Sequence, residues 1–449
     1  MSISVAPASG GGEPRRPVLG SRPHRLAILI SHPVQYFSPL FRLLASRPEV
    51  ETTVLYCSLQ GAERMYDPGF GASFSWDIPL LDGYPYKLLK NWWPGPLGGF
   101  FSCTNPGIIR ELHNGRYDAV IVFGWASVTN WLAFGTAALT GLPWMLYGDS
   151  NVRDEVALLG VKGWLKEVVL GALFRRTRAF LTSGAFNRDF YVFYGAPPEK
   201  CFDAPWPIDN DFFESRSPHA RGRRREIRSA LGIPAESTVF LFVGKLLERK
   251  RPLDLLEALA RLKGIVPSVA VAFVGEGELR RALEVEIARS GLRNAYLLGF
   301  RNQCELSEMY GMADVFVFPS SRDPRGTVTN EAMACGLPVV ISDGVGVWGP
   351  QDIVRNGENG IVYPCGNVGA LAEAMRKLAV DAALRERMGA RALETTREFG
   401  SGRTAEGIVH ALASLDSARP RCAAEAEEAV LPAQCASRRP RHLHGNRGA

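Results

Sequence analysis

The sequence lacks close cysteine pairs, a hydrophobic leader segment and a large excess of one charge. No two of its eight cysteines are spaced as a CxxC pair, so it shows neither a zinc-finger motif nor the framework of a disulfide-rich domain. We therefore expect free, mostly buried thiols in a reducing compartment. Residues 1–25 contain no apolar run of the kind found in signal peptides, which favours a cytoplasmic protein.

The charge is nearly balanced, with 52 Lys and Arg residues against 46 Asp and Glu residues. The excess lies at the ends: residues 1–25 carry four Arg and one Glu, and residues 417–449 carry six Arg and three Glu. A neutral middle argues against a nucleic-acid-binding domain, which would gather basic residues on its folded surface. Hydrophobic residues make up 46% of the chain, as in globular proteins, and 449 residues indicate more than one domain.

Residues 119–148 contain no charged residue, a length that raises the question of a membrane span. However, this stretch is interrupted by Gly124, Asn130, Gly135, Gly141 and Pro143. Because such residues break long apolar helices, the pattern predicts a strand, a helix and a strand of a buried α/β unit.

Short apolar runs alternate with helical stretches along most of the chain, which predicts βαβ units and parallel sheets covered on both faces. The alternation is interrupted near residues 204–213, with a hinge expected around 206–213, and residues 215–225 look basic and irregular. We therefore predict two doubly wound domains that face each other across a cleft, where ligands would bind. The predicted parts are a disordered tail (1–23), a first domain (24–205), a second domain (206–395), a C-terminal helix (396–416) and a disordered basic tail (417–449).

Residues 316–342, with the sequence FVFPSSRDPRGTVTNEAMACGLPVVIS, carry the strongest motif. A strand is followed by a polar loop with Asp323 and Gly326, and a helix begins near Val328 with Glu331 in its first turn. Free N–H groups at a helix N-terminus bind anions such as phosphate. Two carboxylates eight residues apart can accept hydrogen bonds from sugar hydroxyls, so the segment suits a nucleoside diphosphate sugar.

This segment resembles the signature of the family 4 glycosyltransferases, which have the GT-B fold of two Rossmann-like domains. The family has an acidic residue, seven further residues and then Glu, followed by Ala-Met-Ala-x-Gly-x-Pro-Val; here the pair is Asp323 and Glu331. The first acid of the family is usually Glu. The resemblance implies that Glu331 holds the ribose, that Asp323 holds the donor sugar, and that N–H groups near Val328 and Thr329 bind the diphosphate.

Other segments of the second domain are similar to the same family. Residues 240–251 (FLFVGKLLERKR) place Lys245 and Lys250 after Gly244, where the family has Arg and Lys that reach the diphosphate. A GxG sequence at 275–277 matches the family's next strand–helix unit, although alone it is a weak signal. Residues 297–302 (LLGFRN) resemble the loop that holds the nucleobase, with Phe300 and Arg301 as candidates.

The first domain of such enzymes binds the acceptor, and its residues give two further candidates. His32 follows the first predicted strand and would face the cleft, or else cap a helix or lie in the core. Asp149 follows the strand at 144–147 and would approach the acceptor, or else cap the next helix. Asp209, Asn210 and Asp211 have the form of a metal-binding DxD motif, but they lie in the predicted linker, so we expect no metal site.

The resemblance implies transfer of a sugar from a nucleoside diphosphate sugar to an acceptor hydroxyl with retained configuration and no required metal or other cofactor. The acceptor would be a glycan, a lipid-linked molecule or a small molecule. Two alternatives remain: a nucleotide-sugar 2-epimerase of the same fold, or a protein that binds nucleotide sugars without turnover. Residues 163–178 combine an apolar stripe with Lys166, Arg175, Arg176 and Arg178, which predicts either peripheral membrane contact or packing on the first domain.

Overall fold

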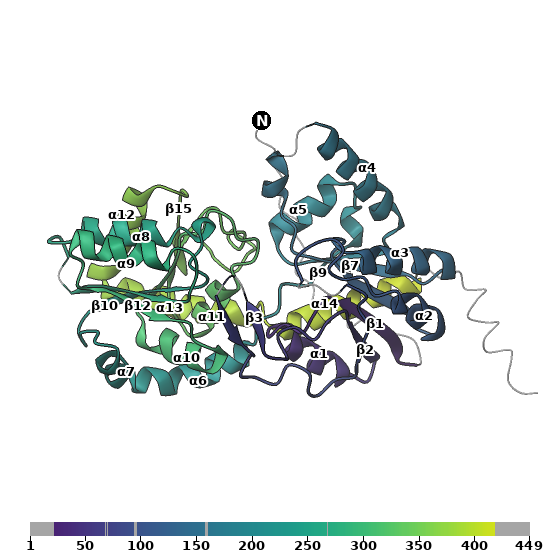
Figure 1. Ribbon diagram of the computed structural model, residues 1–449, viewed down its shortest axis with the longest axis horizontal. Helices are drawn as coiled ribbons and strands as arrows, with labels where there is room; N and C mark the ends of the chain where they lie inside the picture. The colour runs from purple at the N-terminus through teal and green to yellow at the C-terminus, as the bar shows by residue number, and fades with distance from the viewer. Residues whose placement is uncertain are drawn as a thin grey trace, which may run out of the picture.

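The computed structural model describes residues 22–417, apart from residues 68, 70, 94–96, 158–159 and 267. The predicted tails therefore lie almost wholly outside the described residues. Two α/β domains lie next to each other in Figure 1, the first in purple to teal and the second mainly in green. The predicted fold class, two Rossmann-like domains with parallel sheets, is confirmed.

The first domain is built on a parallel sheet of seven strands in the order β5-β2-β1-β6-β7-β8-β9. Alternate residues of β1 face opposite sides of this sheet: Ala27 and Leu29 contact the core under α2 to α5, and Leu26 and Ile28 contact the core under α1. The strands are β1 (His24–Ile30), β2 (Val50–Tyr56), β5 (Tyr86–Leu88), β6 (Ala119–Phe123), β7 (Trp144–Tyr147), β8 (Ala179–Thr182) and β9 (Cys201–Asp203). The helices are α1 (Phe37–Ala45), α2 (Gly107–Asn114), α3 (Val128–Thr140), α4 (Val161–Arg176) and α5 (Ala185–Phe193).

The uncharged segment at 119–148 forms β6, α3 and β7, as predicted. The hydroxyl of Ser127 accepts a hydrogen bond from the N–H of Asn130 at the start of α3, and Gly141 ends the helix with φ of 73°. A left-handed residue at this position favours glycine, because other side chains clash there. The part of the chain that the structure describes contains no helix long and apolar enough to span a membrane.

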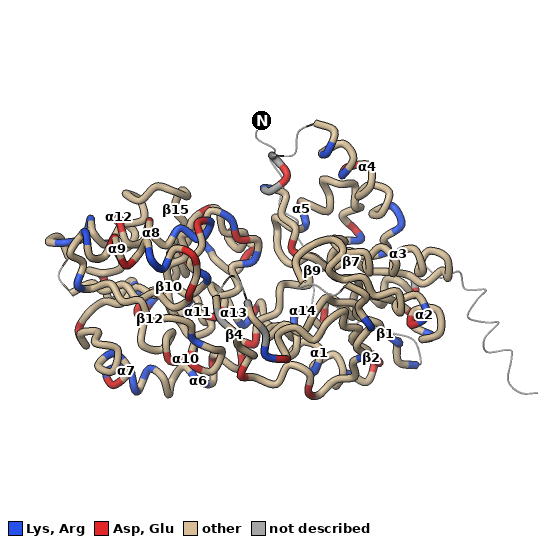
Figure 2. The backbone as a smooth tube through the Cα atoms, viewed as in Figure 1, with Lys and Arg blue, Asp and Glu red and all other residues tan. Residues whose placement is uncertain are grey.

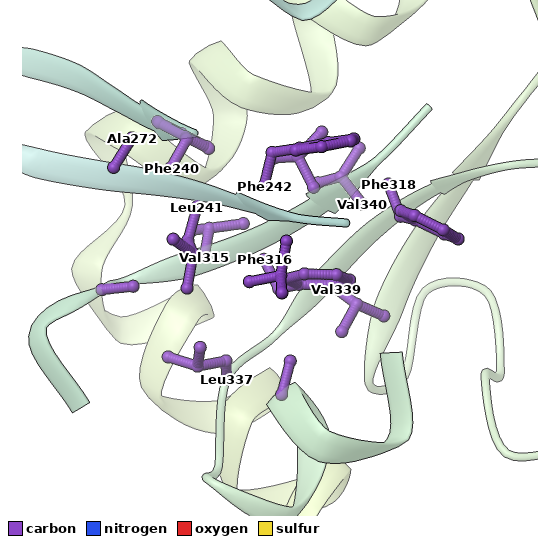
Figure 3. Packing of buried hydrophobic residues seen from close by; sticks show 14 of the residues in the cluster. Phe240, Leu241, Phe242, Ala272, Val315, Phe316, Phe318, Leu337, Val339 and Val340 are labelled. Carbon is purple, nitrogen blue, oxygen red and sulfur yellow. The ribbon is translucent and has the colours of Figure 1, made fainter. Parts of the chain in front are cut away.

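The second domain has a parallel sheet of six strands in the order β12-β11-β10-β13-β14-β15. The strands are β10 (Thr238–Val243), β11 (Val269–Val274), β12 (Ala295–Gly299), β13 (Val315–Phe318), β14 (Val339–Ser342) and β15 (Gly360–Tyr363). The helices are α6 (Asn210–Gly222), α7 (Arg224–Ala230), α8 (Pro252–Leu262), α9 (Arg280–Ser290), α10 (Gln303–Met312), α11 (Thr327–Ala334), α12 (Val368–Val380) and α13 (Ala382–Arg397). Because its central strands are buried on both faces, they form continuous apolar runs in the sequence. Figure 3 shows Phe240 and Phe242 of β10 and Phe316 and Phe318 of β13 among the buried side chains that project from these strands.

The prediction of an irregular segment at 215–225 is wrong, because this segment is helical. Asp209 caps α6 by accepting a hydrogen bond from the N–H of Phe212 at 3.1 Å, and Phe213 and Ala220 are buried against the second domain. The helical pattern was missed because the charged residues on the outer face of this segment outnumber its few apolar residues. The carboxylate of Asp209 in the DxD sequence thus has a structural role as a helix cap.

The last helix, α14 (Ser401–Ser417), returns to the first domain. Its buried residues Ala405, Ile408 and Leu412 belong to the same apolar cluster as Leu40 and Phe41 of α1. The helix thus completes the cover on one face of the first sheet, and the yellow ribbon in Figure 1 follows this crossing. Figure 2 shows Lys and Arg interspersed with Asp and Glu over both domains, in keeping with a neutral folded core.

Candidate active site

The loop after β1 brings two side chains from the first domain to the cleft. His32 lines a cavity between the domains, and its Nδ1 lies 2.8 Å from the hydroxyl oxygen of Ser31. Burial lowers the pKa of His32 to about 4, so the imidazole is neutral at physiological pH. Tyr36 lines the same cavity, and burial, together with the charges of Glu331 and Asp323, raises the pKa of its phenol. Both side chains can thus donate or accept hydrogen bonds without carrying charge.

The loop after β10 supplies cations from the opposite domain. Lys245, Arg249 and Lys250 all line the cavity. Lys250 is only 7% exposed, and its Nζ lies 4.5 Å from the ring centroid of Phe318. Burial lowers the pKa of Lys250, while the neighbouring carboxylate of Asp323 acts in the opposite direction. The loop therefore concentrates positive charge where a polyanionic ligand would lie.

The GxG sequence at 275–277 holds this basic loop in place by close backbone contact. A β-carbon on Gly275, whose φ is 138°, would lie 2.0 Å from the backbone oxygen of Gly244. A β-carbon on Gly277 would lie 2.6 Å from the backbone oxygen of Leu246. Only glycine fits at both positions, so these glycines position the loop that carries Lys245.

The loop before α11 is organised around Asp323. Its Oδ1 accepts hydrogen bonds from the N–H groups of Arg325 at 3.1 Å and Gly326 at 2.7 Å, while Oδ2 is paired with Nζ of Lys250. Although burial acts in the opposite direction, Lys250 and these N–H groups hold the pKa of Asp323 below its usual range. We call residues 323–326 the acid loop; it places the first turn of α11, including Thr327 and Val328, at the cavity.

Glu331 lies one turn into α11 and is 3% exposed. Its Oε2 accepts a hydrogen bond from the hydroxyl of Tyr310 at 2.7 Å. Burial raises the pKa of Glu331 to about 7, and the hydrogen bond from Tyr310 opposes this effect. The carboxyl group is therefore poised between its neutral and ionised forms near physiological pH.

The predicted residues line two adjoining cavities between the domains. The larger, of about 400 Å³, is lined by His32, Gly244, Lys245, Lys250, Asp323 and Val328. The smaller, of about 130 Å³, is lined by Gly244, Phe300, Arg301, Val328 and Glu331. The shared residues connect them, so the structure brings most of the predicted residues into one region. Gly326 and Thr329 lie behind this surface: Gly326 has φ of 47° at the start of α11, and Thr329 is fully buried.

A short hairpin of the first domain, β3 (Met65–Asp67) and β4 (Ala72–Phe74), reaches the second domain beside these cavities. The rings of Phe74 and Phe300 lie 4.6 Å apart, and Nδ2 of Asn302 donates to the backbone oxygen of Ser75 at 2.9 Å. Trp76 lines both cavities. The sequence analysis missed this cover, because three-residue strands are too short to produce a periodic signal.

Asp149 is not among the residues that line the two cavities. It is exposed after β7, and its charge acts on Tyr36 and on the guanidinium of Arg325. Arg325 itself was missed: it is 7% exposed and its Nη1 donates to the backbone oxygen of Ser183 in the first domain. Its only sequence signal is its position inside the acid loop. Tyr310 was also missed, because nothing in the sequence distinguishes it from the other residues on the buried face of its helix.

The comparisons with known proteins agree with this geometry. Residues 223–395 match the model of the family described as glycosyl transferases group 1. A D-inositol 3-phosphate glycosyltransferase of Xylanimonas cellulosilytica is 30% identical over 350 residues, covering 75% of this chain and 81% of that protein. The chain belongs to the group 1 glycosyltransferases. The same enzyme of Geodermatophilus obscurus is 33% identical to this glycosyltransferase over 388 residues, covering 80% and 82% of the two chains.

Solved structures confirm the GT-B fold of this glycosyltransferase. HepE of Anabaena, in complex with UDP and glucose, has a TM-score of 0.64 at 18% identity and covers 87% of this chain and 100% of its own. A glycosyltransferase of Rickettsia africae has a TM-score of 0.67 at 12% identity, covering 88% and 100%. Both similarities cover most of this chain, so they extend over the two domains.

Proposed function

We propose that this glycosyltransferase moves a sugar from a nucleoside diphosphate sugar to an acceptor hydroxyl with retained configuration. The observation that carries the proposal is the 400 Å³ cavity, in which three cations of the second domain face the first turn of α11. A diphosphate carries the opposite charge and gains more of it as the bond to the sugar breaks. Cations fixed beforehand in a buried site stabilise that developing charge without reorganisation.

Different residues of the two cavities would bind the different parts of such a donor. Lys245, Lys250 and the N–H groups at the start of α11 bind the diphosphate. Glu331 lies in the smaller cavity, where its carboxylate can accept hydrogen bonds from ribose hydroxyls, and Phe300 and Arg301 flank the nucleobase. Asp323 contacts Lys250 and is placed to orient both Lys250 and the donor sugar.

The proposed retention rests on the resemblance to the family 4 glycosyltransferases, and the lining of the cavity bears on how it would be achieved. A retaining glycosidase uses a second carboxylate as nucleophile about 5 Å from its acid, whereas the lining of the larger cavity includes one carboxylate, Asp323, already paired with Lys250. We therefore infer a front-side displacement, in which the departing diphosphate takes the proton of the acceptor hydroxyl. His32 and Tyr36 would hold that hydroxyl, and Asp149 would bind the outer part of the acceptor.

The named relatives support a nucleotide donor and leave the acceptor open. HepE is described with UDP and glucose, and the two curated relatives compared above are named D-inositol 3-phosphate glycosyltransferases. We propose a glycan, lipid-linked or small-molecule acceptor, and no metal ion, because the cations of the cavity already supply the charge that a metal would provide.

Turnover of donor with and without acceptor separates this proposal from its alternatives. Incubation with nucleoside diphosphate sugars and a mixed acceptor extract is expected to release nucleoside diphosphate only when acceptor is present. An epimerase would change the donor without acceptor, and a binding protein would shift the melting temperature without turnover.

We further propose a cytoplasmic enzyme that contacts a membrane through α4. The first half of this helix exposes Val161, Trp164, Leu165 and Val168, with exposed fractions between 48% and 79%. Arg175, Arg176 and Arg178 are exposed at its other end, whereas Lys166 is paired with Glu155 at 2.6 Å. Sedimentation with anionic vesicles is expected at low salt and should weaken when Trp164 and Leu165 become Ser; failure to sediment would restrict α4 to packing on the first domain.

A further inference from the structure

Two charged side chains of the second domain are buried against the first domain at the start of α5. Arg325 and Asp352 are 7% and 4% exposed. The guanidinium of Arg325 donates from Nη1 to the backbone oxygen of Ser183 at 3.1 Å, and its Cζ lies 5.4 Å from the ring centroid of Trp206. The carboxylate of Asp352 accepts a hydrogen bond from the backbone N–H of Ala185. A cation and an anion of one domain thus hold the residues that lead into a helix of the other.

The contact is close enough to depend on the absence of a side chain. A β-carbon on Gly184, whose φ is 156°, would lie 2.9 Å from Oδ1 of Asp352 and 3.7 Å from Nη1 of Arg325. Glycine therefore lets the carboxylate of Asp352 approach the backbone here, with Arg325 at ordinary contact distance. An anion at the N-terminus of α5 also interacts favourably with the dipole of that helix.

Arg325 differs from the other fully enclosed arginine of the second domain. Arg228 donates to the backbone oxygens of Met312 and Ser237 and to the carboxylate of Asp314, all within its own domain. By contrast, Nε of Arg325 has no hydrogen-bond partner among the residues that the structure describes. Within the described part of the chain, Arg355 has an unpaired Nε as well, so what sets Arg325 apart is that its side chain donates to a backbone oxygen of the other domain.

The same residue is part of the acid loop. The backbone N–H of Arg325 donates to Oδ1 of Asp323, whose Oδ2 is paired with Lys250. A displacement of Arg325 would therefore break one of the two backbone hydrogen bonds that orient Asp323, and would disturb the pairing of Asp323 with Lys250. The contact with the first domain is thus linked to Lys250 in the larger cavity through two interactions, one between Arg325 and Asp323 and one between Asp323 and Lys250.

We propose that Arg325 and Asp352 form an inter-domain clasp on the start of α5, and that this clasp holds the acid loop in its working position. Arg325 is a positioning residue: it acts through Asp323 and Lys250 and does not touch the reacting atoms. The proposal gives the transferase a direct link between the arrangement of its domains and the geometry of its donor site. It rests on the transferase activity but not on the identity of the nucleotide or acceptor.

The test uses the full-length chain with Arg325→Met, which removes the charge and the donor groups while keeping much of the volume. Gly184→Ala disturbs the same contact from the other domain. Arg355→Met is the matched control, because Arg355 is a partly buried arginine of the second domain whose ion pair, with Glu398 at 2.8 Å, lies within that domain. Hydrogen exchange is measured at the backbone amides of residues 184–188 and at those of 323, 325 and 326, together with kcat and donor KM.

Both Arg325→Met and Gly184→Ala are expected to speed exchange in both segments, while Arg355→Met changes neither. The kcat should fall by roughly 10- to 100-fold in the two clasp variants, since a displacement of about 1 Å is enough for such a loss, and donor KM should change much less. Arg325→Lys, which retains a charged donor, should recover part of the activity. Faster exchange confined to residues 323–326, or an unchanged kcat, would overturn the proposal.

Discussion

Replacement of Glu331 by Gln should change how the stability of the second domain depends on pH. Burial raises the pKa of this carboxyl group from 4.5 to about 7, so between these values the folded protein retains a proton that the unfolded chain has lost. The free energy of unfolding therefore falls as pH rises through this window. The total loss in the free energy of unfolding is about 3 kcal/mol, at about 1.4 kcal/mol for each pH unit. Gln cannot ionise, so the variant should lack this loss.

Calorimetry of the wild-type chain and the variant at pH 5 and pH 8 measures the effect. The melting temperature of the second domain in the variant, relative to that in the wild type, should be higher at pH 8 than at pH 5 by about 6–12 °C. This range follows from about 2–4 °C per kcal/mol for a domain of this size. Glu358→Gln, at an exposed position of the same domain, is the control and should follow the wild type. Parallel profiles for wild type and Glu331→Gln would refute the reasoning.

Three other results are expected. Lys250→Met should lower kcat by about 100-fold with a small change in donor KM, since the charge on the leaving diphosphate grows toward the transition state. If Lys250 served only binding, steady-state kinetics would instead show a raised donor KM with little change in kcat. Gly275→Ala should destabilise the second domain by about 1–3 kcal/mol, because its β-carbon would overlap the backbone of Gly244, and a melting temperature equal to that of wild type would contradict this contact. Incubation with EDTA should leave the initial rate of transfer unchanged, whereas a loss restored by a divalent metal would show that the cations of the cavity are not sufficient.

Much of the fold could be predicted because buried parallel strands leave continuous apolar runs and glycines mark the loops between them. The donor side of the site was accessible for a different reason: Asp323, Glu331 and Lys250 lie in segments that resemble the signature of the family 4 glycosyltransferases. The acceptor side was less accessible, because His32 and Asp149 follow strands without a motif, and the structure places Asp149 outside the two cavities.

The remaining features depend on contacts between segments far apart in the sequence. The sequence shows Arg325 only as a basic residue in a loop, and the arrangement of the two domains is needed to show that it is buried beside Ser183. The pairing of Tyr310 with Glu331 joins two helices whose positions the sequence does not relate. Local patterns therefore predict which loops carry the chemistry, but not which partners set the pKa and orientation of each group.

The most direct test of the proposed function is proton NMR of the transferase with a set of α-configured nucleoside diphosphate sugars and a mixed acceptor extract. The spectrum should show release of nucleoside diphosphate together with a new α-linked anomeric proton, and neither change without acceptor. A β-linked product would contradict the retaining, front-side mechanism. Conversion of the donor in the absence of acceptor would contradict glycosyl transfer as the function of this site.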